Sequence, residues 1–413
     1  MSKNIPKKNT PKAEPVEYKK TAKEEKREAS HHAIDCDKVG EIAIHFGFTI
    51  IKTPHITTSD ISQAKQFKDF DYYGDAEEKI SLMRWYMDEN MQNGPQPLMI
   101  HYKKPLIGGT AQKKPTKEMY GLEIMGSNRS TSEALLIKTT LAILSDLGYN
   151  DVYIDVNSIG DRESISKFER ELGTHFRKHA HSVPAKIREG MKKNHYTILT
   201  SVHPDAEEIQ KNTPQTISAL SEAGRIHFKE VLEYIEAFET AYKIQHKVLS
   251  NKMYACHTVF EIREPVDKKD DEGVMLAYGY RYNYLAKKIG GKKDIPCVGV
   301  TILVKKHPSV TKKVIIKNIK KPRFYLVQLG ATAKLKALNV VEHLRKNKIP
   351  VYHSLTKDKI IGQLSGAEYM KATHVLIIGQ KEAIENTVVV RNIANREQET
   401  VAISDLVNFL KKL

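Results

Sequence analysis

The 413-residue sequence has few of the features that mark membrane and secreted proteins. Its three cysteines, Cys36, Cys256 and Cys297, lie far apart and show neither Cys-x-x-Cys nor Cys/His ligand spacing. We therefore expect no disulfide framework and no metal site, and treat the short cluster of His31, His32 and Cys36 as incidental. No apolar run approaches the roughly 18 to 20 residues of a membrane span, and the lysine-rich start lacks the apolar core of a secretory signal. A cytoplasmic protein without a membrane segment is expected.

Positive charge is what the sequence has in excess. Lysine and arginine number 66 against 50 aspartates and glutamates, which gives a formal net charge of +16. Such a charge attracts polyanions before any specific contact forms, and RNA is the commonest such partner of a soluble protein. Many basic proteins bind no nucleic acid, so charge alone leaves the partner open.

Changes in composition divide the chain into four parts. Residues 1–35 are rich in lysine, glutamate and proline and nearly free of large apolar residues, which predicts a disordered basic tail. Residues 36–304 form a core with a polar, helical insertion at about 180–245. A lysine-rich stretch with two prolines, residues 305–322, is typical of a linker. Strand and helix patterns alternate over residues 323–413, which predicts a compact α/β domain.

The clearest single element is a helix that begins near Ser130. Ser130 and Glu133 have the spacing of a capping box, Leu136 and Leu144 lie on one apolar face, and Gly148 is placed to end the helix. A strand pattern, YNDVYIDVNSIG, follows it directly.

Eight segments in order carry a family resemblance. They are HFGFTIIKTP, EMYGLEIMG, LSDLGYNDVYIDVNSIG, NHYTIL, HTVFE, YGYRYNYLAKKIGG, PCVGVTI and the C-terminal GQLSGAEYMKATHVLIIGQKE with TVVVRNIANREQETV. From about residue 37 to the end, the sequence resembles histidyl-tRNA synthetases. Each segment alone is a weak pattern, but eight in the same order are specific.

The resemblance implies an α+β fold. The core would be the antiparallel sheet of a class II aminoacyl-tRNA synthetase, flanked by helices, and the C-terminal domain would bind an anticodon. It also implies a homodimer with the segment at Pro54 in the interface. The family reaction activates histidine with ATP, which normally carries Mg²⁺, and transfers the histidine to the 3′ end of tRNA.

Three positions where the family has phosphate-binding arginines hold other residues. Gly108 stands at the arginine of the second class II motif, Ser250 at that of the first histidine-specific segment, and Lys306 at that of the third motif. A guanidinium holds phosphate oxygens in two-point geometry, which glycine and serine lack and lysine reproduces only as a point charge. The catalytic residues are therefore unknown.

The amino-acid pocket implied by the resemblance keeps more of its residues. They are Glu77, Glu123, Tyr254, Arg281 and Tyr282. On the residues alone two interpretations stay open: Arg281 and its neighbouring tyrosines line a binding site, or they form a packed sheet surface with one satisfied arginine. The two glutamates are equally compatible with solvated carboxylates.

Three functions follow from these patterns. The first is a histidyl-tRNA synthetase-like protein that binds tRNA or other RNA, with ligase activity lost or strongly weakened and no cofactor. The second is an active but divergent histidine–tRNA ligase, which needs ATP and Mg²⁺. The third is a regulatory subunit of histidine biosynthesis, ranked last because such subunits generally lack the anticodon-binding domain.

Overall fold

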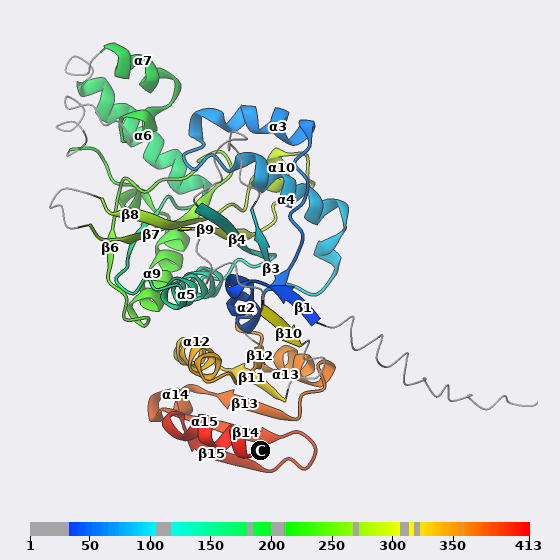
Figure 1. Ribbon diagram of the computed structural model, residues 1–413. Coiled ribbons are helices and arrows are strands. Elements are labelled where there is room, and N and C mark those ends of the chain that lie inside the picture. Colours follow the sequence, from blue (N-terminus) through cyan, green and yellow to red (C-terminus); the bar gives the residue numbers. More distant parts are fainter. Residues whose placement is uncertain are drawn as a thin grey trace, which may run out of the picture.

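The computed structural model describes residues 33–104, 117–179, 185–199, 210, 212–266, 272–305, 314–317, 323–357 and 359–413. Figure 1 shows a large upper part and a smaller lower part, the C-terminal domain. Gly108, Lys306, nearly all of the predicted tail and most of the predicted linker lie outside the described residues.

A mixed sheet of eight strands forms the centre of the described core. In spatial order its strands are β2 (Thr49–Ile50), β3 (Leu98–Lys103), β4 (Lys117–Met125), β9 (Cys297–Lys305), β8 (Val274–Arg281), β7 (Cys256–Glu264), β5 (Tyr153–Ser158) and β6 (Tyr242–Ile244). Only the outermost pairs, β2–β3 and β5–β6, are parallel. The expected fold class, an antiparallel sheet core flanked by helices with a C-terminal α/β domain, is confirmed.

Helices cover both faces of this sheet (Figure 1). On one face lie α2 (Lys38–His45), α5 (Thr131–Asp146) and α9 (Glu222–Glu236); on the other lie α3 (Thr58–Ala64), α4 (Ala76–Asp88), α6 (Arg162–His179) and α10 (Leu285–Lys288). Short 3₁₀ turns join them at η1 (Lys65–Phe70), η2 (Met91–Asn93), η4 (His195–Ile198) and η5 (Thr216–Ala219), and α7 (Ala185–Lys193) lies beyond α6. None of the described helices is long and apolar enough to cross a membrane.

The ends of α5 show one prediction confirmed and one wrong. Gly148 has a φ of +93° and follows the last turn, so it ends the helix as its sequence position indicates. The capping box is absent, because Ser130 Oγ donates to Glu230 and Glu133 pairs with Arg281. The spacing was right for a cap, but partners distant in the sequence take both side chains.

A second, two-stranded sheet joins segments that the sequence analysis treats as tail and linker. β1 (Ala33–Cys36) pairs antiparallel with β10 (Val314–Lys317). Both are short apolar runs next to charged stretches. Their composition does not reveal the pairing, because the partners lie some 280 residues apart.

The C-terminal domain has a five-stranded sheet. Its spatial order is β12 (Val351–His353), β11 (Phe324–Gln328), β13 (His374–Ile378), β14 (Thr387–Asn392) and β15 (Gln398–Ala402). One face carries α12 (Ala331–Lys346), α14 (Gln380–Glu385) and α15 (Ile403–Lys412), and the other carries α13 (Ile360–Tyr369). α12 docks this domain on α5 and α2, where the Arg345 guanidinium holds both oxygens of Asp146 at 2.9 and 3.0 Å.

Candidate functional site

Glu123 is the centre of a buried polar cluster on the α4 side of the large sheet. Its carboxylate is fully buried and accepts hydrogen bonds from Tyr282 Oη at 2.7 Å and Tyr102 Oη at 3.1 Å. It also forms an ion pair with the ammonium of Lys79. Gly299 faces Glu123 on β9, and a Cβ there would lie 1.8 Å from the carboxylate. The missing side chain of Gly299 therefore leaves room for the Glu123 carboxylate.

Lys79 enters this cluster from α4 and is 1% exposed. Burial disfavours its charged form, but the carboxylates of Glu123, Asp75 and Glu78 outweigh that effect and hold the pKa of Lys79 above its ordinary value. The lysine is therefore a permanent cation next to Glu123. Its ammonium lies directly against the Glu123 carboxylate.

Tyrosines complete the same interior. Tyr280 is 1% exposed and donates to Asp75 Oδ1 at 2.6 Å, and Tyr254 is fully buried with its ring edge-on to Phe67 at 5.2 Å between centroids. Burial and the neighbouring Asp75 raise the pKa of Tyr280 well above its ordinary value. These phenols are neutral and packed against the chain's own side chains.

The neighbouring region, between the end of β3 and strands β9 and β8, is filled in the same way. Lys104 is 4% exposed, donates to Thr301 Oγ1 at 2.6 Å and pairs with Glu78 at 2.8 Å. Tyr278 stacks on Tyr73 with ring centroids 4.2 Å apart. Glu77 lies half-buried in the first turn of α4, adjacent in sequence to Glu78.

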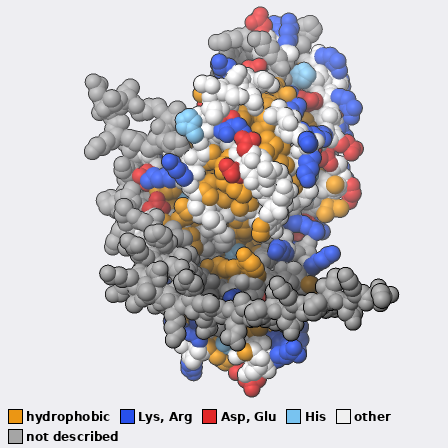
Figure 2. All heavy atoms as spheres, turned by 90° about the vertical axis from the view of Figure 1, so that its right-hand side faces the viewer, with side chains coloured by type: hydrophobic (Ala, Val, Ile, Leu, Met, Phe, Trp, Pro, Cys, Tyr) orange, Lys and Arg blue, Asp and Glu red, His pale blue; other side chains and the backbone are white. Residues whose placement is uncertain are grey.

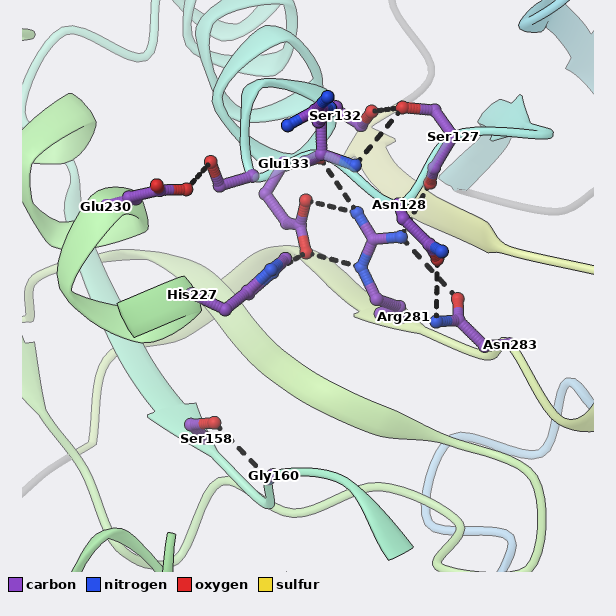
Figure 3. A network of polar contacts seen from close by, with 12 residues as sticks. Ser127, Asn128, Ser132, Glu133, Ser158, Gly160, His227, Glu230, Arg281 and Asn283 are labelled. Atoms are coloured by element: carbon purple, nitrogen blue, oxygen red, sulfur yellow. Dashed lines mark hydrogen bonds and ion pairs between the residues drawn. The ribbon is translucent and has the colours of Figure 1, made fainter. Parts of the chain in front are cut away.

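Arg281 points to the opposite face of the sheet, toward α5 (Figure 3). Its Nε donates to Glu133 Oε1 at 2.7 Å, a second bond joins Nη2 to Glu133 Oε2, and Nη1 donates to the Ser127 carbonyl at 2.7 Å. The side chain is 0% exposed. Successive strand residues face opposite ways, so Tyr282 and Arg281 lie on different sides of the sheet.

The carboxylate of Glu133 is shared with a histidine. His227 Nε2 lies 2.8 Å from Glu133 Oε1. Burial by itself raises the pKa of Glu133, but the charges of Arg281 and His227 outweigh burial and hold that pKa well below its usual range. The guanidinium and the carboxylate satisfy each other inside the protein.

Of the five predicted pocket residues, the structure brings together Glu123 and Tyr282, which are hydrogen-bonded. Tyr254 packs near Tyr280 in the same apolar cluster, and Glu77 lies on the neighbouring helix α4. Arg281 is separated from them by the sheet.

Of the three positions at which the resemblance predicts arginines, Ser250 is the one that the structure describes. It is 0% exposed, in a loop held by Asn157, whose Nδ2 donates to the Val248 carbonyl at 3.0 Å, and by Asn251, whose Nδ2 donates to the Phe67 carbonyl at 3.2 Å. A guanidinium at position 250 would need these neighbours to move.

In the described part of this region, Glu78 and Glu123 are already paired with lysines and not free for a magnesium ion. Their respective partners are Lys104 and Lys79, and the interior is filled by tyrosines. Among the described residues, histidine, cysteine, aspartate and glutamate side chains form no group of three or more that could hold a metal ion.

The C-terminal sheet presents a different surface. α13 packs over β11 and β13, and the same side of the sheet continues through Arg391 of β14 to Gln398 and Thr400 of β15. Arg391 is half-buried, while Gln398 and Thr400 are exposed. At the end of α13, Tyr369 is 86% exposed. An arginine, amides and an open aromatic ring are groups that bind nucleotides.

Sequence reasoning missed Lys79, Tyr102 and Glu133 as partners. A lysine in the apolar stripe of α4 and a glutamate inside the nearly all-buried α5 were the available signals. Lysine and glutamate are both common in helices, so neither Lys79 nor Glu133 indicated a buried partner from its sequence alone.

Comparisons with known proteins find an anticodon binding domain and similarity to histidine–tRNA ligases. The family pattern described as an anticodon binding domain matches residues 313–413. The histidine–tRNA ligase of Thermosynechococcus vestitus is 28% identical over 334 residues, 79% of this chain and 76% of the relative. That of Chlorobium phaeobacteroides is 23% identical over 389 residues and 88% of each chain. The solved apo histidyl-tRNA synthetase of S. aureus is 21% identical over 94% of this chain and 96% of its own, with a TM-score of 0.49.

Proposed function

Because this chain belongs to the histidyl-tRNA synthetase family, we propose that it binds tRNA through its C-terminal domain without activating histidine efficiently. The observation that carries this proposal is the interior around Glu123. Lys79, Tyr102 and Tyr282 all contact its carboxylate, so that an amino acid bound there would compete with the protein's own side chains.

The altered arginine positions support the same conclusion. A single charge-assisted contact made mainly in the transition state is worth about 3 to 4 kcal/mol, or roughly a hundred- to a thousand-fold in rate. Gly108, Ser250 and Lys306 replace three such groups in the family pattern. Even with incomplete additivity, the loss would remove most of a ligase's rate advantage.

The deciding experiment is histidine-dependent exchange of pyrophosphate into ATP by the purified protein. The T. vestitus ligase serves as a positive control under identical conditions. We expect exchange at background, and no gain in Ser250→Arg, because that buried position has no room for a guanidinium. Exchange well above background would instead identify a divergent ligase that uses ATP and Mg²⁺. The observation that favours this second candidate is the similarity of the chain to histidine–tRNA ligases.

Binding of tRNA is tested separately by filter binding over a salt series. We expect the affinity to fall steeply as salt rises, because phosphate contacts release counterions. A protein that binds no tRNA at low salt would refute the proposal. Recovery of a histidine-biosynthesis enzyme in a pull-down would favour the regulatory subunit, which the complete C-terminal domain disfavours.

The proposed assembly is a homodimer in the cytoplasm. Apolar side chains gather on the face toward the right of Figure 1 (Figure 2). Partly exposed Trp85 of α4, Met91 of η2 and Leu98 of β3 belong to the elements on this side. An apolar face of this kind is typical of a subunit interface. Sedimentation equilibrium should give twice the chain mass; a monomer at micromolar concentration would count against the dimer.

A further inference from the structure

A cleft of about 400 Å³ lies where the C-terminal domain meets the core, away from the Glu123 cluster. α5 contributes Thr131 to its lining, and α12 contributes Ala331 and Lys334. Glu230 and Glu233 of α9 form another wall. In Figure 1, α12 lies directly below α5 and α9.

The two helices that meet at this cleft run in the same direction. At their other ends, Asp146 is the last residue of α5 and Arg345 the next to last of α12, and these two side chains form the bidentate pair between the domains. Since the C-terminal ends are joined, both N-terminal ends point at the cleft. Each helix dipole places about half a positive charge there.

Neither described helix supplies an anion of its own to neutralise these ends. The first turn of α12 contains no acidic residue, and its N-cap, Gly330, has no side chain to accept a hydrogen bond. In α5 the first-turn Glu133 is taken by Arg281, and Ser130 makes no capping bond. Uncapped N–H groups of helices are favourable sites for phosphate.

A second observation points to a ligand at the same place. Thr131 lines the cleft and is 5% exposed, and its hydroxyl has no hydrogen-bond partner among the described residues. Buried hydroxyls are normally paired. The cationic residues Arg129 and Lys334 also line the cleft.

The acidic wall restricts the class of ligand. Glu230 accepts a hydrogen bond from Ser130 Oγ at 2.5 Å, and Glu233 lies 3.7 Å from Lys229 on the same helix. A bare phosphate would be attracted by one wall and repelled by the other. A ribose phosphate satisfies both, because its hydroxyls donate to carboxylates.

We propose that this interdomain cleft binds one ribonucleotide unit. Its phosphate lies at the N-termini of α5 and α12, and its ribose hydroxyls donate to Glu230 and Glu233. The volume is within the range of small-molecule sites. The unit comes either from an RNA strand, in which case the inference rests on the proposed tRNA binding, or from a free mononucleotide.

The test compares Ala331→Glu with Asn339→Glu. Both positions are exposed and on α12, and both changes add one negative charge, but only Ala331 lines the cleft. A glutamate at a helix N-terminus is compatible with folding. Thr131→Val removes the unpaired hydroxyl and keeps the shape. Affinity for tRNA is measured over a salt series, and AMP and dAMP are titrated by calorimetry.

If RNA is the source, Ala331→Glu weakens tRNA binding at least tenfold relative to Asn339→Glu and lowers the salt slope by about 0.7 to 0.9, the value of one phosphate. If a free nucleotide is the source, wild-type protein binds AMP more tightly than dAMP, and Ala331→Glu and Thr131→Val both weaken it.

Two results together would overturn the inference. The first is equal tRNA affinity of Ala331→Glu and Asn339→Glu. The second is that wild-type protein binds AMP no more tightly than dAMP, and Ala331→Glu binds AMP as tightly as wild type does. Wild-type protein that binds no tRNA would refute the proposed function alone, since the AMP titration then decides the cleft by itself.

Discussion

The cluster around Glu123 in the core and the open face of the C-terminal sheet differ in how far their polar residues are exposed. In the core, Glu123, Lys79 and Arg281 are 0 to 1% exposed and satisfied by other side chains. In the C-terminal domain, Tyr369 is 86% exposed, and Gln398 and Thr400 lie open on the sheet. The polar groups named in the core contact other side chains of the protein, whereas those named in the C-terminal domain are open to a partner.

Glycines show how the core accommodates large buried side chains. Gly299 faces Glu123, Gly121 faces Tyr102 and Gly279 faces Phe260 across paired strands, and a Cβ at each would lie within 2.4 Å of the facing side chain. Tyr102 and Glu123 lie on the α4 side of the sheet and Phe260 on the α5 side, so both faces use such glycines. Each of these large buried side chains therefore depends on a glycine of the neighbouring strand.

The largest effect is expected from breaking the buried ion pair of the core. Arg281→Met leaves Glu133 charged and without its guanidinium, which should lower the free energy of unfolding by about 3 to 5 kcal/mol. Urea denaturation measures it. The double variant Arg281→Met/Glu133→Leu should recover part of the loss. If Arg281→Met unfolds like wild type, the network is not structural.

A pH effect should follow from His101, which is 3% exposed in the core. Burial lowers its pKa to about 4, against the weaker opposing effects of Asp37 and the Gly121 carbonyl. The unfolded chain takes up this proton near pH 6.5 and the folded chain only near 4, so stability is full above 6.5 and falls as pH drops between them.

The slope expected from His101 is up to about 1.4 kcal/mol per pH unit. Urea unfolding at pH 7, 6, 5 and 4.5 measures the pH slope of the free energy of unfolding, and this slope should be smaller in His101→Gln by the contribution of His101. His374→Gln in the C-terminal domain is the matched control, because His374 is half-buried and its pKa is lowered less by burial. Equal slopes in both variants would remove this contrast between the regions.

Binding should respond in the opposite region. Tyr369→Ala is expected to weaken tRNA binding by about tenfold with unchanged folding, because an exposed aromatic ring can stack on an unpaired base. Tyr73→Phe, in the core, keeps the stacked ring and should leave tRNA affinity unchanged. If Tyr73→Phe lost tRNA affinity and Tyr369→Ala did not, the RNA-binding surface would lie on the core and not on the C-terminal domain.

The smallest effect is expected for an exposed ion pair of the C-terminal domain. Lys381 and Glu385 lie 4.0 Å apart on α14 with side chains 76% and 50% exposed. Solvent screens such pairs, so Lys381→Ala should change stability by less than about 0.5 kcal/mol. A larger loss in thermal or urea unfolding would show that surface charges also hold this domain together.

Much of the fold was predictable because it depends on local and ordered patterns. The helix ended by Gly148 and the alternating strands and helices of the C-terminal domain could be predicted from the sequence. The eight segments that resemble the family, taken in their order along the sequence, identified the class of fold. The pairing of residues 33–36 with 314–317 was missed, because no local pattern shows contacts between segments so far apart.

The sequence by itself determined that Gly108, Ser250 and Lys306 stand where the resemblance predicts arginines, and which polar residues were available near them. Only the tertiary structure decided how those residues pair. Strand alternation places Tyr282 with Glu123 on one face and turns Arg281 to the other, where Glu133 lies. The physical reason is that a buried charge must find its partner in space, and the sequence does not list spatial neighbours.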